Sequence, residues 1–209
     1  MSDLRDKILH SREAWVEGSN CNERFVMRLL KMVRSELTET GDRDWFFDCL
    51  EQSSIRISHI EPMARRVASG LTRLGVSPGH IVHTAYNSQL DFYWPVLGAW
   101  MCGAGASVAD PGLSVDVVRA QLEDTRARVV VVSAQAASTF LAANQLLPEE
   151  DRVRHILIID RDPWQPMPDG CQSFRSLYQD DGTSCPKSLP AYDPLEVAVI
   201  HWTSGTTVC

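Results

Sequence analysis

The sequence lacks both glycine-rich motifs that most often mark a nucleotide site. No Gly-x-Gly-x-x-Gly occurs in the 209 residues, and neither does a Walker A loop, which needs Gly, four residues and then Gly-Lys-Ser/Thr. The chain therefore shows no sign of a dinucleotide-binding domain of the usual kind or of a P-loop NTPase.

The sequence also lacks metal-binding cysteine pairs and long apolar runs. Its six cysteines contain no Cys-x-x-Cys and form no cluster with histidine at zinc-like spacing, so we interpret them as scattered reduced thiols and expect no metal site. No stretch of 18 apolar residues occurs, and the amino terminus mixes both charges without the apolar core of a signal peptide. These absences predict a cytoplasmic protein with no transmembrane segment.

An excess of positive charge is absent too. Lys and Arg number 20 against 27 Asp and Glu, which gives a net charge of -7. A protein that binds nucleic acid through its backbone needs a basic face, so DNA and RNA are not expected partners. The composition, 44% hydrophobic and 22% charged, is that of a folded domain with a sizeable core.

Strand and helix patterns alternate through the middle of the chain. The valine run Val129-Val130-Val131-Val132 is typical of a buried strand. We expect strands at 81–85, 106–108, 128–133 and 155–159, and helices at 88–101, 115–124 and 134–144. This alternation predicts an α/β fold with a mostly parallel sheet flanked by helices. The aromatic stripe on the helix at 88–101 is interpreted as core.

In the first part of the chain, the sequence pattern predicts two helices and a hairpin. Apolar spacing indicates a helix over residues 22–37, and the segments 45–47 and 55–57 resemble a short hairpin. Ser58 and Glu61 have the spacing of a capping box for a second helix that runs to Gly75.

Residues 160–194 contain six prolines and almost no periodic apolar pattern. They predict a long surface excursion. Too few residues follow for a second domain, so the apolar run at 197–202, which is interpreted as a buried strand, must return to the same sheet or to a sheet whose remainder is missing.

The segment after that run carries the functional signal. Thr203, Ser204, Gly205, Thr206 and Thr207 place hydroxyl groups around a glycine directly after a strand. Glycine permits close approach of the backbone, and the N–H and O–H donors can converge on a phosphate. Clusters of Ser, Thr and Gly also occur in ordinary loops, so the motif alone leaves both interpretations open.

From about Trp45 onward the chain resembles the adenylate-forming ligases: acyl-CoA synthetases, 4-coumarate-CoA ligases and beetle luciferases. Their loop runs Thr-Ser-Gly-Thr-Thr-Gly-x-Pro-Lys-Gly; Thr203 to Thr207 match it, Val208 stands where the family has glycine, and Pro-Lys-Gly is absent. The resemblance continues upstream in Leu71, in Gly75 to Gly79 with His80 in place of an acid, in Asn87, in Gly105-Ala106, and in Asp110-Pro111 and Asp193-Pro194.

The resemblance implies a parent enzyme that joins ATP and a carboxylic acid into an acyl-adenylate and pyrophosphate, then passes the acyl group to coenzyme A. It assigns Thr203, Ser204, Gly205, Thr206 and Thr207 to cofactor binding. ATP, Mg and coenzyme A are implied for the parent, and this chain is not expected to bind them productively. No catalytic residue is assigned, because the family elements that bind adenine, magnesium and the acyl group lie beyond position 209.

The chain as written is therefore expected to be an inactive amino-terminal fragment of such a ligase. We divide it into a lead-in and helix at 1–44 and a truncated AMP-binding domain at 45–209. An exposed sheet edge is expected to favour self-association, and a full-length parent could be peroxisomal. The rival interpretation is a non-catalytic α/β module for protein interaction or small-ligand binding.

Overall fold

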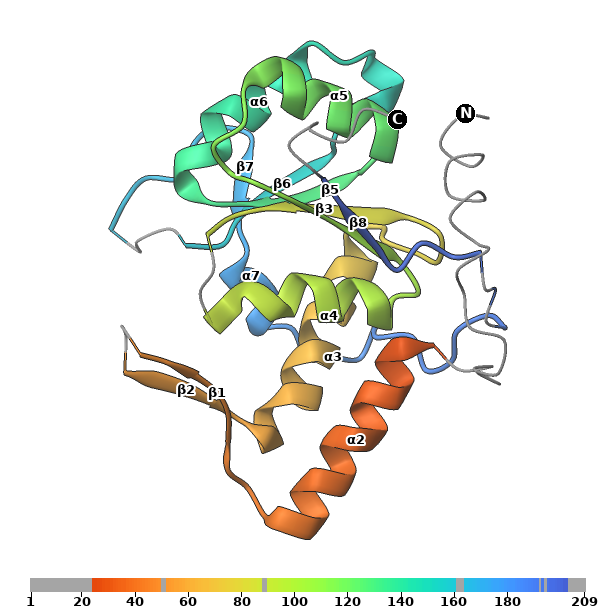
Figure 1. The fold of residues 1–209 in the computed structure, drawn as a ribbon. Coiled ribbons are helices and arrows are strands. Elements are labelled where there is room, and N and C mark those ends of the chain that lie inside the picture. Colours follow the sequence, from red (N-terminus) through yellow and green to blue (C-terminus); the bar gives the residue numbers. More distant parts are fainter. Residues whose placement is uncertain are drawn as a thin grey trace.

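The computed structural model describes residues 24–49, 52–87, 90–160, 164–191, 193 and 195–202. A six-stranded parallel sheet forms the centre, with strand order β7-β6-β5-β3-β4-β8, and helices cover both of its faces (Figure 1). The strands are β3 (Ile81–Ala85), β4 (Gly105–Ala109), β5 (Val129–Val132), β6 (His155–Ile158), β7 (Cys171–Ser173) and β8 (Val199–His201). The expected α/β class with a parallel sheet is confirmed.

Alternation along the strands divides the core between the two faces. In β5, Val129 and Val131 pack with helices α3 (Ile57–Arg73) and α4 (Tyr93–Met101), whereas Val130 and Val132 pack on the opposite side with α5 (Val115–Thr125) and α6 (Ala137–Gln145). Successive side chains of a strand point to opposite faces, so a valine run with both faces covered is fully buried. No helix in the described part of the chain is long and apolar enough to cross a membrane.

Helix α2 (Phe25–Thr40) and the hairpin that follows it lie on the side of the sheet that α3 covers, and they contact α3. Helix α2 buries Val26, Leu30 and Val33, and the expected hairpin is present as β1 (Asp44–Asp48) and β2 (Ser53–Arg56), paired antiparallel. They form the lower part of the view in Figure 1.

The expected capping box at the start of α3 is wrong. The helix already begins at Ile57, and Ser58 lies within its first turn, where its N–H donates to Asp42 Oδ1 at 3.1 Å. The Glu61 carboxylate turns outward to Arg34 and Arg65 instead of reaching back to the helix start. An acidic side chain from the loop between α2 and β1 thus accepts a hydrogen bond from the first turn of α3, in place of the helix's own serine.

Helix α4 also begins later than expected. A 3-10 turn, η2 (Leu90–Phe92), precedes it, and α4 itself starts at Tyr93 rather than Ser88, which lies outside the described residues. The aromatic stripe belongs to the core as expected, since Trp94 and Leu97 are buried.

The proline-rich excursion contains structure that its composition did not indicate. It adds β7 to the sheet edge beside β6 and then forms the short helix α7 (Arg175–Tyr178), which packs on α3. Phe174 and Leu177 are buried there. The interpretation of 160–194 as a surface excursion is therefore wrong for its central part, because two apolar side chains anchor a segment too short to show a period.

Candidate functional site

The apolar run before the Ser/Thr/Gly segment forms the edge strand β8. It runs parallel to β4, with Ala106 opposite Val199 and Ser107 opposite Ile200, so the chain returns to the same sheet. The expectation of a buried strand is wrong, because the strand is only three residues long and half-buried to exposed. In the described part of the chain, β4 is its one neighbouring strand.

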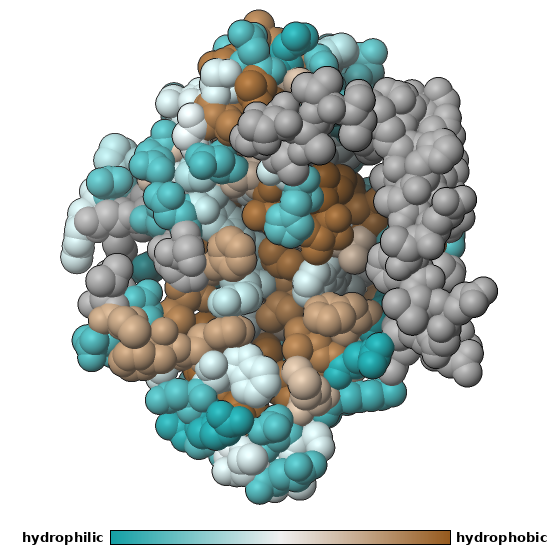
Figure 2. All heavy atoms as spheres, viewed as in Figure 1, coloured by the Kyte–Doolittle hydropathy of each residue, from teal (hydrophilic) through white to brown (hydrophobic). Residues whose placement is uncertain are grey.

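Two indole groups hold β8 in place. Trp100 of α4 donates its Nε1–H to the carbonyl of Ala198 at 2.7 Å, just before the strand begins. Trp202 donates its Nε1–H to Ser107 Oγ at 2.8 Å, just after the strand ends. Hydrophobic residues gather around this edge on the face shown in Figure 2.

From Trp202 a series of hydrogen bonds continues into the buried part of the sheet. Ser107 Oγ lies 2.9 Å from Nδ1 of His83, the residue opposite it in β3. Both side chains are fully buried, on the sheet face that α5 and α6 cover. The polar residues His83 and Ser107, which lie in mainly apolar strands, are the sequence signal for these contacts, and the sequence analysis missed it.

Full use of the Ser107 hydroxyl selects one tautomer of His83. The indole N–H can only donate, so Ser107 Oγ accepts from Trp202. The serine hydrogen has no other acceptor among the described residues and is donated to His83 Nδ1, which leaves the imidazole proton on Nε2. That Nε2–H has no hydrogen-bond acceptor in the described structure, and the ring lies tilted against Phe140 at 5.5 Å.

Burial keeps His83 uncharged. Removal of the ring from water lowers its pKa to about 4, from an ordinary value of 6.5. The end of β8 is therefore tied to the core by neutral hydrogen bonds rather than by an ion pair.

Other positions that the sequence predicted lie at the carboxyl ends of the strands, where β8 also ends. The carboxyl ends of parallel strands meet at one edge, and there Asn87 follows β3 and Asp110 follows β4. Asp110 Oδ1 accepts the N–H of Gly112 at 2.6 Å and closes a turn, and the exposed side chain of Asn87 lies near the end of its strand. The structure thus brings these positions to the edge where β8 ends.

The predicted binding residues Thr203, Ser204, Gly205, Thr206 and Thr207 lie outside the described residues. The last described residue before them is Trp202, which follows β8 and donates a hydrogen bond to Ser107 of β4. Within the described ranges no three His, Cys, Asp or Glu side chains gather as metal ligands, and Cys49, Cys102, Cys171 and Cys185 are free thiols.

Comparison with known proteins places this edge in a family context. The model of the AMP-binding enzyme family matches residues 36–208, a range that includes the Ser/Thr/Gly segment. A 4-coumarate–CoA ligase of Oryza sativa subsp. japonica is 27% identical over 183 residues, covering 87% of this chain and 30% of that protein. One of Pinus taeda is 27% identical over 173 residues, covering 82% and 30%. The chain thus spans about three tenths of the length of these relatives.

Solved structures share the fold. The luciferase-like enzyme of the mealworm Zophobas morio superposes with a TM-score of 0.71 at 17% identity, covering 88% of this chain and 41% of that one. An anthranilate CoA ligase in complex with anthranoyl-AMP gives a TM-score of 0.68 at 21% identity, covering 86% and 32%.

Proposed function

Because this chain belongs to the family of AMP-binding enzymes, we propose that it carries the amino-terminal, phosphate-loop part of an ATP-dependent carboxylate–CoA ligase. In the proposed parent reaction, a carboxylate oxygen attacks the α-phosphate of ATP and pyrophosphate leaves. The coenzyme A thiol then takes the acyl group and AMP leaves. The observation that carries the proposal is that the family match includes the segment directly after β8.

The similar proteins support the same reaction class. The matched relatives from Oryza sativa and Pinus taeda are described as 4-coumarate–CoA ligases, and one structural neighbour is an anthranilate CoA ligase. These names favour a carboxylic acid as the substrate and a ligase over the rival non-catalytic module.

The proposed role of the Ser/Thr/Gly segment is to hold the phosphates of ATP. The hydroxyls of Thr203, Ser204, Thr206 and Thr207 donate hydrogen bonds to phosphate oxygens, and Gly205 lets the backbone N–H groups approach them. The donor set fits a phosphate group. Mg and coenzyme A belong to the family reaction, and we assign no described residue to them.

Strand β8 and its anchors position that segment. Trp202 immediately precedes Thr203, and its hydrogen bond to Ser107 supports a fixed starting point for the proposed loop. Since His83 and Ser107 are fully buried, this attachment point belongs to the rigid core rather than to a mobile surface.

We further propose that this chain alone does not form acyl-adenylates. We also propose the division expected from the sequence, with a lead-in and helix at 1–44 and part of an AMP-binding domain at 45–209. The chain spans about three tenths of its relatives, and Val208 replaces a loop glycine of the family. A cytoplasmic location is proposed on the basis of the free thiols in the described part of the chain.

Trapping with hydroxylamine tests the proposed inactivity. The purified chain is incubated with ATP, Mg and 4-coumarate, and the expected hydroxamate equals that of a heat-denatured sample. Hydroxamate above that control, from protein free of host ligases, would contradict the proposal.

Thermal unfolding tests the proposed loop. Pyrophosphate is expected to leave the melting temperature of this chain unchanged, because valine at 208 disfavours a positive φ that glycine allows. Val208→Gly combined with extension by the family's Pro-Lys-Gly should produce a rise, and Thr206→Val in the extended chain should reduce it. No rise in the extended chain would contradict phosphate binding by this segment.

A further inference from the structure

A cavity lies between the helices and the proline-rich segment, away from the edge described above. It is open to solvent on one side, has a volume of about 340 Å³ and is lined by α2, α3, the end of α4 and residues 186–191. Met101 in its lining lies close in sequence to Gly105, where β4 begins, so the cavity sits near the amino ends of the strands. The Ser/Thr/Gly segment follows the carboxyl end of β8, so the two locations belong to opposite edges of the sheet.

The lining has cationic groups and no acidic side chain among the described residues. Arg24, Arg65 and Lys187 contribute the charges. Arg24 is paired with Glu196, donating from Nη2 to Oε1 at 2.7 Å, so it adds little net charge. Lys187 is exposed and has no ion pair among the described residues.

Arg65 belongs to a cluster with excess positive charge. It donates to Glu61 Oε1 at 2.9 and 3.0 Å, but the same carboxylate also accepts two hydrogen bonds from Arg34 at 2.5 and 2.7 Å. One carboxylate therefore serves two guanidinium groups. Counted with Lys187, and with Arg34 although it does not line the cavity, these described side chains carry a net charge of about +2.

Apart from Ser188, the remaining side chains of the lining are apolar. Leu30 and Met101 are buried, and Met27 and Leu189 are partly exposed. Unbranched methionine side chains adapt to apolar ligands of different shape. A cavity of this volume with an apolar lining and a few placed charges has the character of a small-molecule site.

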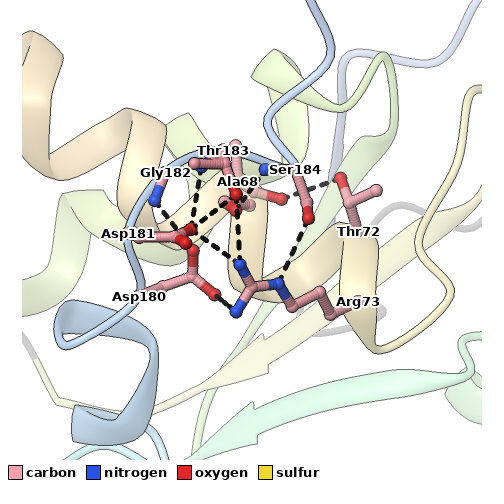
Figure 3. A network of polar contacts seen from close by, with 9 residues as sticks. Ala68, Thr72, Arg73, Asp180, Asp181, Gly182, Thr183 and Ser184 are labelled. Atoms are coloured by element: carbon pink, nitrogen blue, oxygen red, sulfur yellow. Dashed lines mark hydrogen bonds and ion pairs between the residues drawn. The ribbon is translucent and has the colours of Figure 1, made fainter.

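The wall formed by residues 186–191 is held at both ends. Before it, Arg73 of α3 pairs with Asp180 at 3.0 Å and with Asp181 at 2.6 Å, and the N–H of Ser184 donates to Ser69 Oγ at 2.9 Å (Figure 3). The Asp181 carboxylate also accepts from the N–H and the hydroxyl of Thr183, which closes the turn.

At the other end, Leu189 packs closely on Gly103, where a Cβ atom would lie 3.2 Å from its side chain. Arg24 donates to the carbonyl of Pro190 at 3.3 Å. These contacts form the cavity without a ligand, which lowers the entropy cost of binding.

We propose that this cavity binds a small amphipathic carboxylate. Lys187, supported by Arg65, faces the carboxylate, and Met27, Leu30, Met101 and Leu189 contact the apolar tail. This site goes beyond the ligase reaction, because it lies at the opposite edge of the sheet from the proposed phosphate loop.

Methionine methyl NMR with octanoate tests the proposal in the intact chain. Addition of octanoate should shift the methyl resonances of Met27 and Met101, and octanamide, which has the same tail without the charge, should bind at least about 10-fold more weakly. Equal binding of octanamide, shifts confined to other methionines, or no binding of octanoate would overturn the proposal.

Charge variants provide the matched controls. Lys187→Glu should weaken octanoate binding at least about 10-fold, and Lys187→Arg should keep it within about 2-fold. Arg119→Glu, which changes an exposed cation on α5, should leave it unchanged. An equal loss in Lys187→Glu and Arg119→Glu would show a non-specific charge effect and contradict the site.

Discussion

At His83, burial and hydrogen bonding act in the same direction. Protonation would place a charge in the core and would remove the acceptor that Nδ1 offers to Ser107. Both costs favour the neutral ring, whose pKa is lowered to about 4. The residue therefore links the stability of the sheet to pH through one side chain.

The pH dependence of unfolding tests this link. In the unfolded chain His83 takes up a proton near pH 6.5, whereas in the folded protein it does so near 4. The contribution of His83 to the free energy of unfolding should therefore fall as pH drops from about 6.5 to 4 and stay constant below that, with a total change of at most about 3 kcal/mol. Urea unfolding at pH 7, 5.5 and 4 measures it.

The variant His83→Leu isolates this contribution, because His155, whose pKa burial also lowers, remains in both proteins. As pH falls from 7 to 4, the free energy of unfolding of the original protein should fall more than that of the variant. A difference that stays constant from pH 7 to 4 would show that His83 does not titrate as described.

Helices α3 and α4 meet at a glycine. A Cβ atom on Gly98 would lie 2.5 Å from Val67 Cγ1, and these two helices make the most extensive contact between elements in the described structure. Gly98 therefore sets how closely the two helices approach, even though glycine is a poor helix former.

We expect Gly98→Ala to destabilise the protein by about 2 kcal/mol, since overpacking outweighs the gain of about 1 kcal/mol in helix propensity. Urea unfolding measures the change. Val67→Ala should restore space, so the double variant should show a favourable coupling of at least about 1 kcal/mol. Additive losses in the two single variants would contradict direct contact at this point.

The Arg73 contacts lead to a prediction for the segment 180–191. Arg73→Gln should release residues 180–191 and increase trypsin cleavage after Lys187 several-fold, while the free energy of unfolding falls by only about 1 kcal/mol, because the guanidinium is about half exposed. Arg119→Gln breaks a comparable surface pair with Glu123 and should not change cleavage after Lys187. Equal cleavage in both variants would mean that other contacts hold the segment.

The elements differ in how far the sequence could predict them. The strand at 81–85 and the helix start at Val115 agree with the structure, because a mainly apolar run marks the strand and a clear turn precedes the helix. Strand β7 and helix α7 were missed. Phe174 and Leu177 are too few to show a periodic pattern, and their burial depends on packing against α3, which is distant in the sequence. The His83–Ser107–Trp202 contacts join three strands and depend on register, which one sequence does not display.

At the scale of the whole molecule, β8 is the last strand on its side of the sheet among the described residues. Val199 and Ile200 are half-buried, and in the described structure only β4 pairs with the strand. Unpaired backbone groups beside apolar side chains favour pairing with another chain.

We therefore expect self-association that increases with protein concentration in sedimentation velocity. Ile200→Lys should reduce it, because a charged edge disfavours pairing, and Val117→Lys, which changes an exposed valine on α5, should not. A single monomer species across the concentration range would show that the edge is protected.

We propose that the segment after β8 is the phosphate loop of an AMP-binding enzyme, and the indole N–H of Trp202 is the nearest described reporter of that segment. NMR titration with pyrophosphate of the Val208→Gly chain extended by Pro-Lys-Gly tests it most directly. The Trp202 indole resonance should shift and saturate, whereas Trp100, at the other end of β8, should not move, and the unmodified chain should show no shift. An unmoved Trp202 in the extended chain, or a shift of equal size in the unmodified chain, would contradict the account.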